Sequence, residues 1–246
     1  MNLRSWCGLL VLLGAWMLAV VWSDPFFIPA PWVVAHRAVA LMVQPSILGD
    51  IGSSVTRVVS SFVVAAMVGV PVGLWLGLHR NVLESVSFVI DFFRSTPATA
   101  MIPVFLLWFG VGDASKIAVA AFSSALVIVF NVSYGVSHAE KARVLAARIM
   151  GATRFKLFSS VVFWESLPSV IIGLRNAVSI SLIVIIVTEM VVGTTMGIGR
   201  RIIDFQSVYD IAGMYTMILV VGFIGYLLNA FFSLLEHRLV HWHQHV

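Results

Sequence analysis

Long apolar runs separated by short polar segments set the pattern of this chain. Six runs are long enough to cross a bilayer, because a membrane-spanning helix needs about 20 mainly apolar residues. They lack the alternation of apolar and polar positions that is typical of barrel strands, which favours helices. We therefore expect an all-α, polytopic membrane protein with one transmembrane domain over residues 1–246. The expected spans cover about residues 6–22, 52–78, 86–109, 115–135, 168–192 and 212–235.

Composition supports this interpretation. Hydrophobic residues make up 60% of the chain and charged residues 11%, whereas about a quarter of the residues of soluble proteins are charged. The single Cys7 allows no internal disulfide. An apolar run after Arg4 would also suit a cleavable signal peptide. Trp6, Trp16 and Trp22 favour a retained first helix with tryptophans near its ends.

The distribution of Lys and Arg predicts the orientation. Six spans place both termini on one side of the membrane, and eight basic residues on that side face four in the opposite loops. Because basic loops stay in the cytoplasm, we expect cytoplasmic termini. The four residues expected outside are Arg37, Lys116, Arg200 and Arg201. No basic stripe combines with exposed aromatic residues, so the sequence does not indicate a nucleic-acid partner.

One segment expected in the cytoplasm, residues 138–167, is unusually basic. It holds five of the fifteen Lys and Arg residues, Lys141, Arg143, Arg148, Arg154 and Lys156. Helical spacing predicts one apolar face of Ala142, Leu145, Ala146, Ile149 and Met150. We expect Gly151 to end this helix, Thr153 to cap a second one, and Pro168 to occupy the first turn of the next span. A lipid-bound interfacial helix and a protein-docking helix fit this pattern equally well.

Residues 138–167 resemble the cytoplasmic EAA loop of permeases in binding-protein-dependent ABC importers, whose pattern is E-A-A-x-x-x-G followed by L-P; we call them the coupling segment. The core of that pattern is matched by Ala146, Ala147, Arg148, Gly151, Ala152 and Thr153, and its end by Leu167 and Pro168. Two positions depart from it. Leu145 replaces the glutamate, and Trp164 replaces a proline that is often present. A salt bridge made by that glutamate in the family is therefore not expected here.

Other stretches are similar to the nitrate, sulfonate, taurine and bicarbonate branch of these permeases. They are DFFRSTPATAMI with Pro103 and LLWFGVGDASKI within residues 91–117, TEMVVGTTMGIGRRI at 188–202, and HRLVHW at 237–242. The matches keep their order and spacing from about residue 48 to residue 242. The resemblance implies a type I importer permease in the bacterial cytoplasmic (inner) membrane.

The resemblance also implies partners. A homodimer of permeases in membrane lipid would contact two cytoplasmic ABC ATPase subunits and an external or periplasmic substrate-binding protein. No Walker A pattern, G-x-x-x-x-G-K-[ST], occurs in the chain. The chain is therefore expected to be no enzyme and to hold no cofactor, while the ATPase subunits bind ATP and Mg. Residues 140–156 would dock on the ATPase through the small Ala146, Ala147, Gly151, Ala152 and Thr153 and the basic Lys141, Arg143, Arg148 and Arg154.

Polar residues within the spans are candidates for the translocation path, because they are costly in lipid. The candidates are Arg94, Thr96, Pro97, Thr99, Asn131, Ser179, Ser181 and Glu189. Asp91 and Arg94 are three residues apart, which predicts an ion pair. Arg94 is the only cation that we expect to be buried. Pro97 is expected to break its helix, and Glu189 fits either an outer gate or an anchor for Arg200 or Arg201.

The cargo implied by the resemblance is a small oxyanion or sulfonate, such as nitrate, taurine, an alkanesulfonate or bicarbonate. A pyrimidine vitamin precursor or another small organic molecule is the alternative. An ion-coupled secondary transporter is less favoured, because only Asp91 and Glu189 are candidate membrane acids. A membrane enzyme would need a catalytic cluster, and none is visible. A basic tail is favoured over a metal site for His237, His241, His243 and His245.

Overall fold

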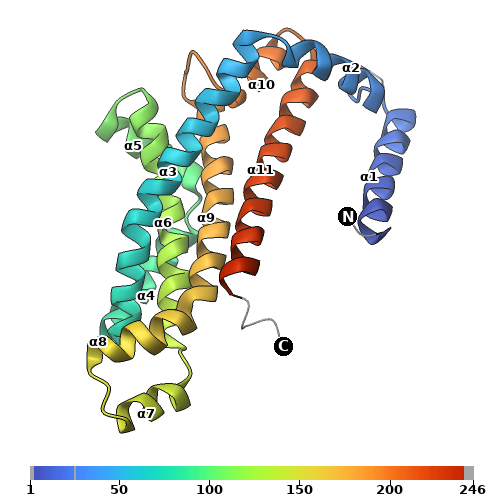
Figure 1. Cartoon of the computed structure of the whole chain (residues 1–246). Coiled ribbons are helices and arrows are strands. Elements are labelled where there is room, and N and C mark those ends of the chain that lie inside the picture. Colours follow the sequence, from blue (N-terminus) through green and yellow to red (C-terminus); the bar gives the residue numbers. More distant parts are fainter. Residues whose placement is uncertain (1–2, 25, 241–246) are drawn as a thin grey trace. The chain divides into compact units, whose positions relative to one another are not determined.

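The computed structural model describes residues 3–24 and 26–240 (Figure 1). This part of the chain is helical and contains no strand, which confirms the all-α prediction. The chain divides into two compact units, Met1–Ser54 with Glu189–Ile224, and Val55–Thr188 with Gly225–Val246. We call them the first and second units. A single transmembrane domain over residues 1–246 stays a prediction.

The first unit contains α1 (Leu3–Trp22), α2 (Pro31–Met42), the start of α3 (Pro45–Leu78), α10 (Ile198–Ser207) and the start of α11 (Ile211–Leu239). Pro31 begins α2, where its missing N–H costs no hydrogen bond. Trp16 Nε1 donates to the carbonyl of Pro29, 3.1 Å away, and joins α1 to the start of α2. Arg37 of α2 pairs with Asp210 at the start of α11, with 2.5 Å from Nη2 to Oδ2.

The second unit contains the rest of α3 and α11, together with α4 (Arg80–Ser95), α5 (Ile102–Phe109), α6 (Asp113–Ser137), α7 (Lys141–Ile149), α8 (Arg154–Leu157) and α9 (Phe163–Val191). Its core includes Ala65, Ile128, Val132, Val170 and Ala177. Glycines at every fourth position of α3 let α6 approach closely. A Cβ atom on Gly73 would lie 2.7 Å from Val132 Cβ, and one on Gly77 would lie 2.5 Å from Val136 Cβ.

The six expected spans are only partly recovered. Four helical stretches in the described chain are long and apolar enough to cross a membrane: Pro45–Leu78, Asp113–Ser137, Arg154–Val191 and Ile211–Leu239. The expected span 86–109 is instead a pair of helices, Arg80–Ser95 and Ala98–Phe109, bent by 92°, which would make a fifth span. The first apolar run lies in α1, where only the shorter stretch Leu10–Trp22 counts as an apolar helix. A count of six spans therefore stays a prediction.

The expected place of Pro168 is wrong. The helix begins earlier, at Arg154, and continues through a π turn, Phe158–Val162, into α9, so Pro168 lies in its interior. Membrane helices tolerate such prolines because neighbouring groups satisfy the freed carbonyl. Helices α2 and α10 were not among the elements predicted from the sequence. Of the four tail histidines, His237 lies in α11, and the prediction for His241, His243 and His245 falls outside the described residues.

Candidate functional site

The coupling segment folds as predicted around Gly151. Helix α7 ends in a tight turn in which Gly151 N donates to Arg148 O (3.0 Å) and Ala152 N donates to Ala147 O (3.0 Å). Gly151 has a φ of +79°, a conformation that L side chains rarely adopt. A Cβ atom at this position would have no atom within 4 Å. The glycine is therefore needed for the turn, and no neighbouring group of this chain requires its small size.

Thr153 caps α8, as predicted. Its hydroxyl accepts a hydrogen bond from Lys156 N at 3.3 Å, which satisfies one of the free amides at the start of the helix. Because α8 continues into the π turn and α9, this cap also begins the stretch Arg154–Val191. The two turn residues thus connect a short exposed helix to a long apolar one.

Arg143 anchors α7 to α9. Its guanidinium bonds the carboxylate of Glu165, which is mostly buried, and lies 3.0 Å from Glu140 Oε2. Arg143 was expected to make ionic contacts with a partner, whereas in the structure it pairs with two carboxylates of its own chain. Lys141 begins α7, but its side chain lies outside the described part of the structure.

The outward surface of the coupling segment is made of large apolar side chains. Ile149, Met150 and Phe155 are 78%, 79% and 81% exposed, and Leu145 is also exposed. Of the small residues expected at the docking surface, Ala146 is exposed but Ala147 is buried within the chain. Arg148, Thr153 and Arg154 are exposed beside the apolar group, and Ala152 is half-buried. We call Leu145, Ile149, Met150 and Phe155 the apolar knob.

The predicted break in the third span is confirmed. Helix α4 ends at Ser95, and a 3-10 turn, Ala98–Met101, follows Pro97. The Thr96 hydroxyl donates to Phe92 O at 2.9 Å, so it is satisfied inside its own helix. Pro97 and Thr99 are exposed. The bend therefore leaves Thr99 as the candidate path hydroxyl on the surface of this unit.

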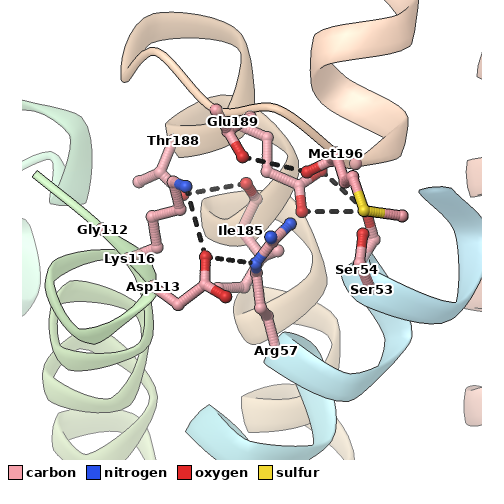
Figure 2. A network of polar contacts seen from close by, with 12 residues as sticks. Ser53, Ser54, Arg57, Gly112, Asp113, Lys116, Ile185, Thr188, Glu189 and Met196 are labelled. Carbon is pink, nitrogen blue, oxygen red and sulfur yellow. Dashed lines mark hydrogen bonds and ion pairs between the residues drawn. The ribbon is translucent and has the colours of Figure 1, made fainter. Parts of the chain in front are cut away.

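The predicted pair of Asp91 and Arg94 is also present, with 3.2 Å between Oδ1 and Nη2. The Arg94 guanidinium lies 3.9 Å from the ring centre of Phe130 on α6. The expectation that Arg94 is the only buried cation is wrong: Arg94 is exposed, whereas Arg57 and Lys116 are almost fully buried. Figure 2 shows both of them directed to Asp113, with distances of 2.8 Å and 3.4 Å to Oδ1.

The other polar candidates of the second unit make hydrogen bonds within the protein, and two of them, Ser181 and Ser179, join neighbouring helices. Ser181 is fully buried, and its hydroxyl lies 2.8 Å from that of Ser124 on α6. Ser179 accepts from Asn229 Nδ2 of α11 at 3.0 Å. Asn131 donates to Val127 O at 2.8 Å within α6. These contacts favour helix packing over a solute-lining role for Ser181, and they leave Ser179 and Asn131 half-buried.

Glu189, in the first unit, belongs to a buried cluster that the sequence analysis missed. Figure 2 shows its carboxylate directed to the Ser54 hydroxyl, which donates to it at 2.7 Å. Asp50, one turn before Ser54 on α3, is also buried and bonds Arg201 through both Nε (2.8 Å) and Nη2 (2.5 Å). We call Asp50, Ser54 and Glu189 the carboxylate cluster.

The carboxylate cluster holds the start of α10. Three successive backbone amides donate to its members: Gly197 N to Asp50 (2.9 Å), Ile198 N to Ser54 (2.8 Å) and Gly199 N to Glu189 (3.0 Å). The amides of a first helical turn have no partner within the helix, so buried side chains that accept from them complete the structure. Gly197 has a φ of +144°, and a Cβ atom there would lie 2.6 Å from Glu189 Cδ.

Arg200 and Arg201, which were expected as possible partners of Glu189, pair with other carboxylates. Arg201 pairs with Asp50, and Arg200 pairs with Asp204 one turn later at 2.7 Å. The described residues contain no group of three or more His, Cys, Asp or Glu side chains that could hold a metal ion. The carboxylate cluster thus joins α3 and the end of α9 to the start of α10.

Comparison with known proteins identifies a family that matches this helical chain. Residues 69–241 match the family described as "Binding-protein-dependent transport system inner membrane component". The chain belongs to this family. It is therefore a membrane permease subunit of an ABC importer for a small solute, and the matched residues include the whole coupling segment.

Curated relatives cover between 75% and 97% of the chain. A probable ABC transporter permease protein of Brucella abortus (strain 2308) is 28% identical over 232 residues, which are 94% of this chain and 92% of the relative. The taurine transport system permease protein TauC of Escherichia coli is 25% identical over 97% of this chain and 89% of its own. The bicarbonate transport system permease protein CmpB of Synechococcus elongatus is 28% identical over 75% of this chain and 66% of its own.

Solved structures support the same fold. A chain from inward-facing conformations of the MetNI methionine ABC transporter superposes with a TM-score of 0.68 at 18% sequence identity. The match covers 88% of this chain and 99% of that chain. At this identity the likeness concerns the fold alone, and it confirms the permease-like architecture that the sequence predicted.

Proposed function

We propose that this permease imports a small oxyanion or sulfonate, such as nitrate, taurine, an alkanesulfonate or bicarbonate. The observation that carries the proposal is the chemistry named for its relatives. Besides the taurine and bicarbonate permeases, a putative aliphatic sulfonates transport permease protein of Bacillus subtilis is 24% identical over 87% of this chain. Taurine, sulfonates and bicarbonate share a compact group with a negatively charged oxygen.

The assembly that we propose is a permease homodimer with two cytoplasmic ABC ATPase subunits and an external substrate-binding protein. The coupling segment supports an ATPase contact. Its apolar knob is too exposed to be a core of this chain, and exposed apolar patches rimmed by polar residues mark interaction sites. The exposed Arg148 and Arg154 supply that rim. ATP and Mg are assigned to the partner subunits, and both termini to the cytoplasm.

The structure suggests how ATPase closure would reach the membrane. Helix α7 is tied to α9 by the Arg143–Glu165 ion pair, and the buried Ala147 fixes its inner side. A displacement of α7 would therefore move the start of the long helix that contains α9. Rigid-body movements of this kind are a common way to alternate between two states.

Reconstitution tests the proposal. The permease is purified together with the ABC ATPase that associates with it and is placed in liposomes with its cognate substrate-binding protein. ATP-dependent uptake is then measured for taurine, nitrate, bicarbonate and a neutral pyrimidine. We expect uptake of one of the anions in the presence of the binding protein. Preferential uptake of the pyrimidine would contradict the assigned cargo, and failure to recover any ATPase would contradict the assembly.

A further inference from the structure

One turn of α9 carries polar side chains in the middle of a long apolar helix. Arg175, Asn176 and Ser179 lie near the centre of α9, inside the apolar stretch Arg154–Val191. The Asn176 side chain is exposed and has no hydrogen-bond partner among the described residues. The Arg175 side chain is 41% exposed. We call these three residues the polar turn.

The rest of this exposed side of α9 is apolar. Ile172, Ile183 and Met190 are exposed and share a helix face with Asn176. A polar side chain in hydrocarbon is costly, and long side chains such as Arg and Lys avoid the cost by reaching the membrane surface. Asn176 is too short to do so from the centre of the helix. In the assembled permease the polar turn therefore faces water or protein, and not lipid.

Asn229 of α11 fixes the orientation of the Arg175 guanidinium. Its Oδ1 accepts from Arg175 Nε at 3.2 Å, while its Nδ2 donates to Ser179 Oγ and to Gly225 O, both at 3.0 Å. These residues all belong to the second unit. Because both ends of the Asn229 amide are engaged, Arg175 is held through Nε, and its Nη2 makes no hydrogen bond with a described residue.

The carboxylate nearest to Arg175 is only loosely paired with it. Glu236 Oε2 lies 3.7 Å from Arg175 Nη1, which is longer than the roughly 2.8 Å of a charged hydrogen bond. Glu236 comes near the end of α11, at Leu239, whereas Arg175 lies near the centre of α9. The described chain thus presents a cation that is positioned by a neutral amide and hydrogen-bonded by no carboxylate.

A direct contact between two copies of this turn would be unfavourable without an anion. Near the axis of a two-fold homodimer each surface meets its own copy, so the two Arg175 guanidiniums would approach each other. Like charges repel strongly where water is scarce. A compact oxyanion between them would remove this repulsion, and the planar guanidinium forms paired hydrogen bonds with such groups.

We propose that the polar turn is the anion-contacting position of the translocation path. Arg175 binds the negatively charged oxygens, Asn176 donates from its free amide, and Asn229 is the positioning residue. The inference deepens the proposed function and rests on it. Arg94 is the poorer candidate, because its guanidinium is already paired with Asp91 and lies over the Phe130 ring.

Arg175→Gln and Asn176→Ala test the assignment. The permease–ATPase complex and its cognate binding protein are placed in liposomes, and ATP-dependent uptake of taurine, nitrate and bicarbonate is measured beside ATP hydrolysis. We expect the number of anions taken up per ATP to fall at least about tenfold in Arg175→Gln and about threefold in Asn176→Ala. Stimulation of ATP hydrolysis by the binding protein should stay within about twofold, because neither residue lies in the coupling segment.

Asn176→Ala separates contact with the anion from a structural role. Its melting temperature should equal or exceed that of the wild type, because the lost amide has no partner in the described chain and alanine favours helix. The matched control is Asn81→Ala, which removes an exposed amide from α4 and should leave anion uptake per ATP unchanged. Arg175→Gln also removes the hydrogen bond to Asn229, so Asn176→Ala decides if that variant fails to fold.

Equal uptake per ATP in Asn176→Ala and Asn81→Ala would overturn the proposal. Dissociation of the permease dimer in Asn176→Ala would overturn it too, and would assign the polar turn to the contact between copies. A wild-type complex that takes up none of the three anions would contradict the proposed function itself. That failure is distinguishable, because the other two outcomes are measured in a system whose wild type transports an anion.

Discussion

The coupling segment and the carboxylate cluster handle side-chain polarity in opposite ways. The coupling segment exposes its apolar knob and keeps its ion pair, Arg143 with Glu165, partly in water. The carboxylate cluster buries Asp50 and Glu189 almost completely and satisfies them with amides, a hydroxyl and Arg201. The first region leaves apolar surface uncovered, and the second has completed its polar contacts within one compact unit.

The difference indicates which region a partner would complete. Association with a partner is favoured by about 25 cal/mol for each Å² of apolar surface that the partner removes from water. A buried carboxylate that already accepts hydrogen bonds from protein donors gains no further stabilisation from a partner. Removing one of its donors destabilises the protein strongly. Substitutions in the carboxylate cluster should therefore affect folding, and substitutions in the apolar knob should affect association.

The largest effect is expected for Glu189→Ala. The change removes the acceptor of the Ser54 hydroxyl and of Gly199 N in a buried place, so the free energy of unfolding should fall by about 3 kcal/mol. Unfolding by denaturant in detergent measures the change. Glu84→Ala removes an exposed carboxylate from α4 and should cost no more than about 0.5 kcal/mol. Equal denaturant concentrations at the midpoint of unfolding for the two variants would show that the carboxylate cluster does not stabilise the fold.

A smaller effect, on binding alone, is expected for Ile149→Asp. A charge at the centre of the apolar knob should weaken association with the ATPase by about 2 kcal/mol, or roughly 30-fold in Kd. The free energy of unfolding should change by less than about 0.5 kcal/mol, because the side chain is exposed. Biolayer interferometry with nanodisc-held permease measures the affinity.

Asn81→Asp is the control for Ile149→Asp, since it adds the same charge to an exposed position of α4. It should leave the affinity for the ATPase unchanged. If Ile149→Asp binds as tightly as this control, the apolar knob lies against lipid and not against a protein.

Local chemistry made part of the site predictable from the sequence. Gly151, Thr153, and the pair of Asp91 and Arg94 act within one or two helical turns, and each has the geometry that its spacing predicts. The break at Pro97 follows from the same local rules. Such features depend on the backbone near one residue, so no knowledge of the tertiary fold is needed.

Long-range contacts were not predictable in this way. Asp50 meets Arg201 across 151 positions of sequence, and Ser54 meets Glu189 across 135. Arg57 and Asp113 come from separate helices of the second unit. Periodicity also failed to show that Ala147 faces inward while its neighbour Ala146 is exposed. These assignments depend on which helices pack together, which a single sequence does not state.

Gly151→Ala should have a still smaller effect, confined to the coupling segment. An alanine at a φ of +79° costs about 1 kcal/mol, with no clash because nothing lies within 4 Å. Hydrogen exchange of the amides in 141–157 should become faster by roughly fivefold. Gly193→Ala is the control, since Gly193 has equal space and no positive φ. Equal rates of hydrogen exchange in the two variants would contradict the argument that the positive φ at position 151 requires glycine.

The smallest effect is expected for the ion pair that anchors α7. A double-mutant cycle of Arg143→Gln and Glu165→Gln should give a coupling energy of about 0.5 kcal/mol, because Arg143 is mostly exposed and water screens the pair. The coupling energy should approach zero in 1 M salt, where the Debye length is about 3 Å. The exposed pair of Arg80 and Glu84 serves as the matched cycle. A coupling energy above about 2 kcal/mol that persists in salt would contradict this screening argument. Helix α7 would then be held to α9 by an ion pair that water does not screen. The apolar knob would in that case be held as firmly as the carboxylate cluster.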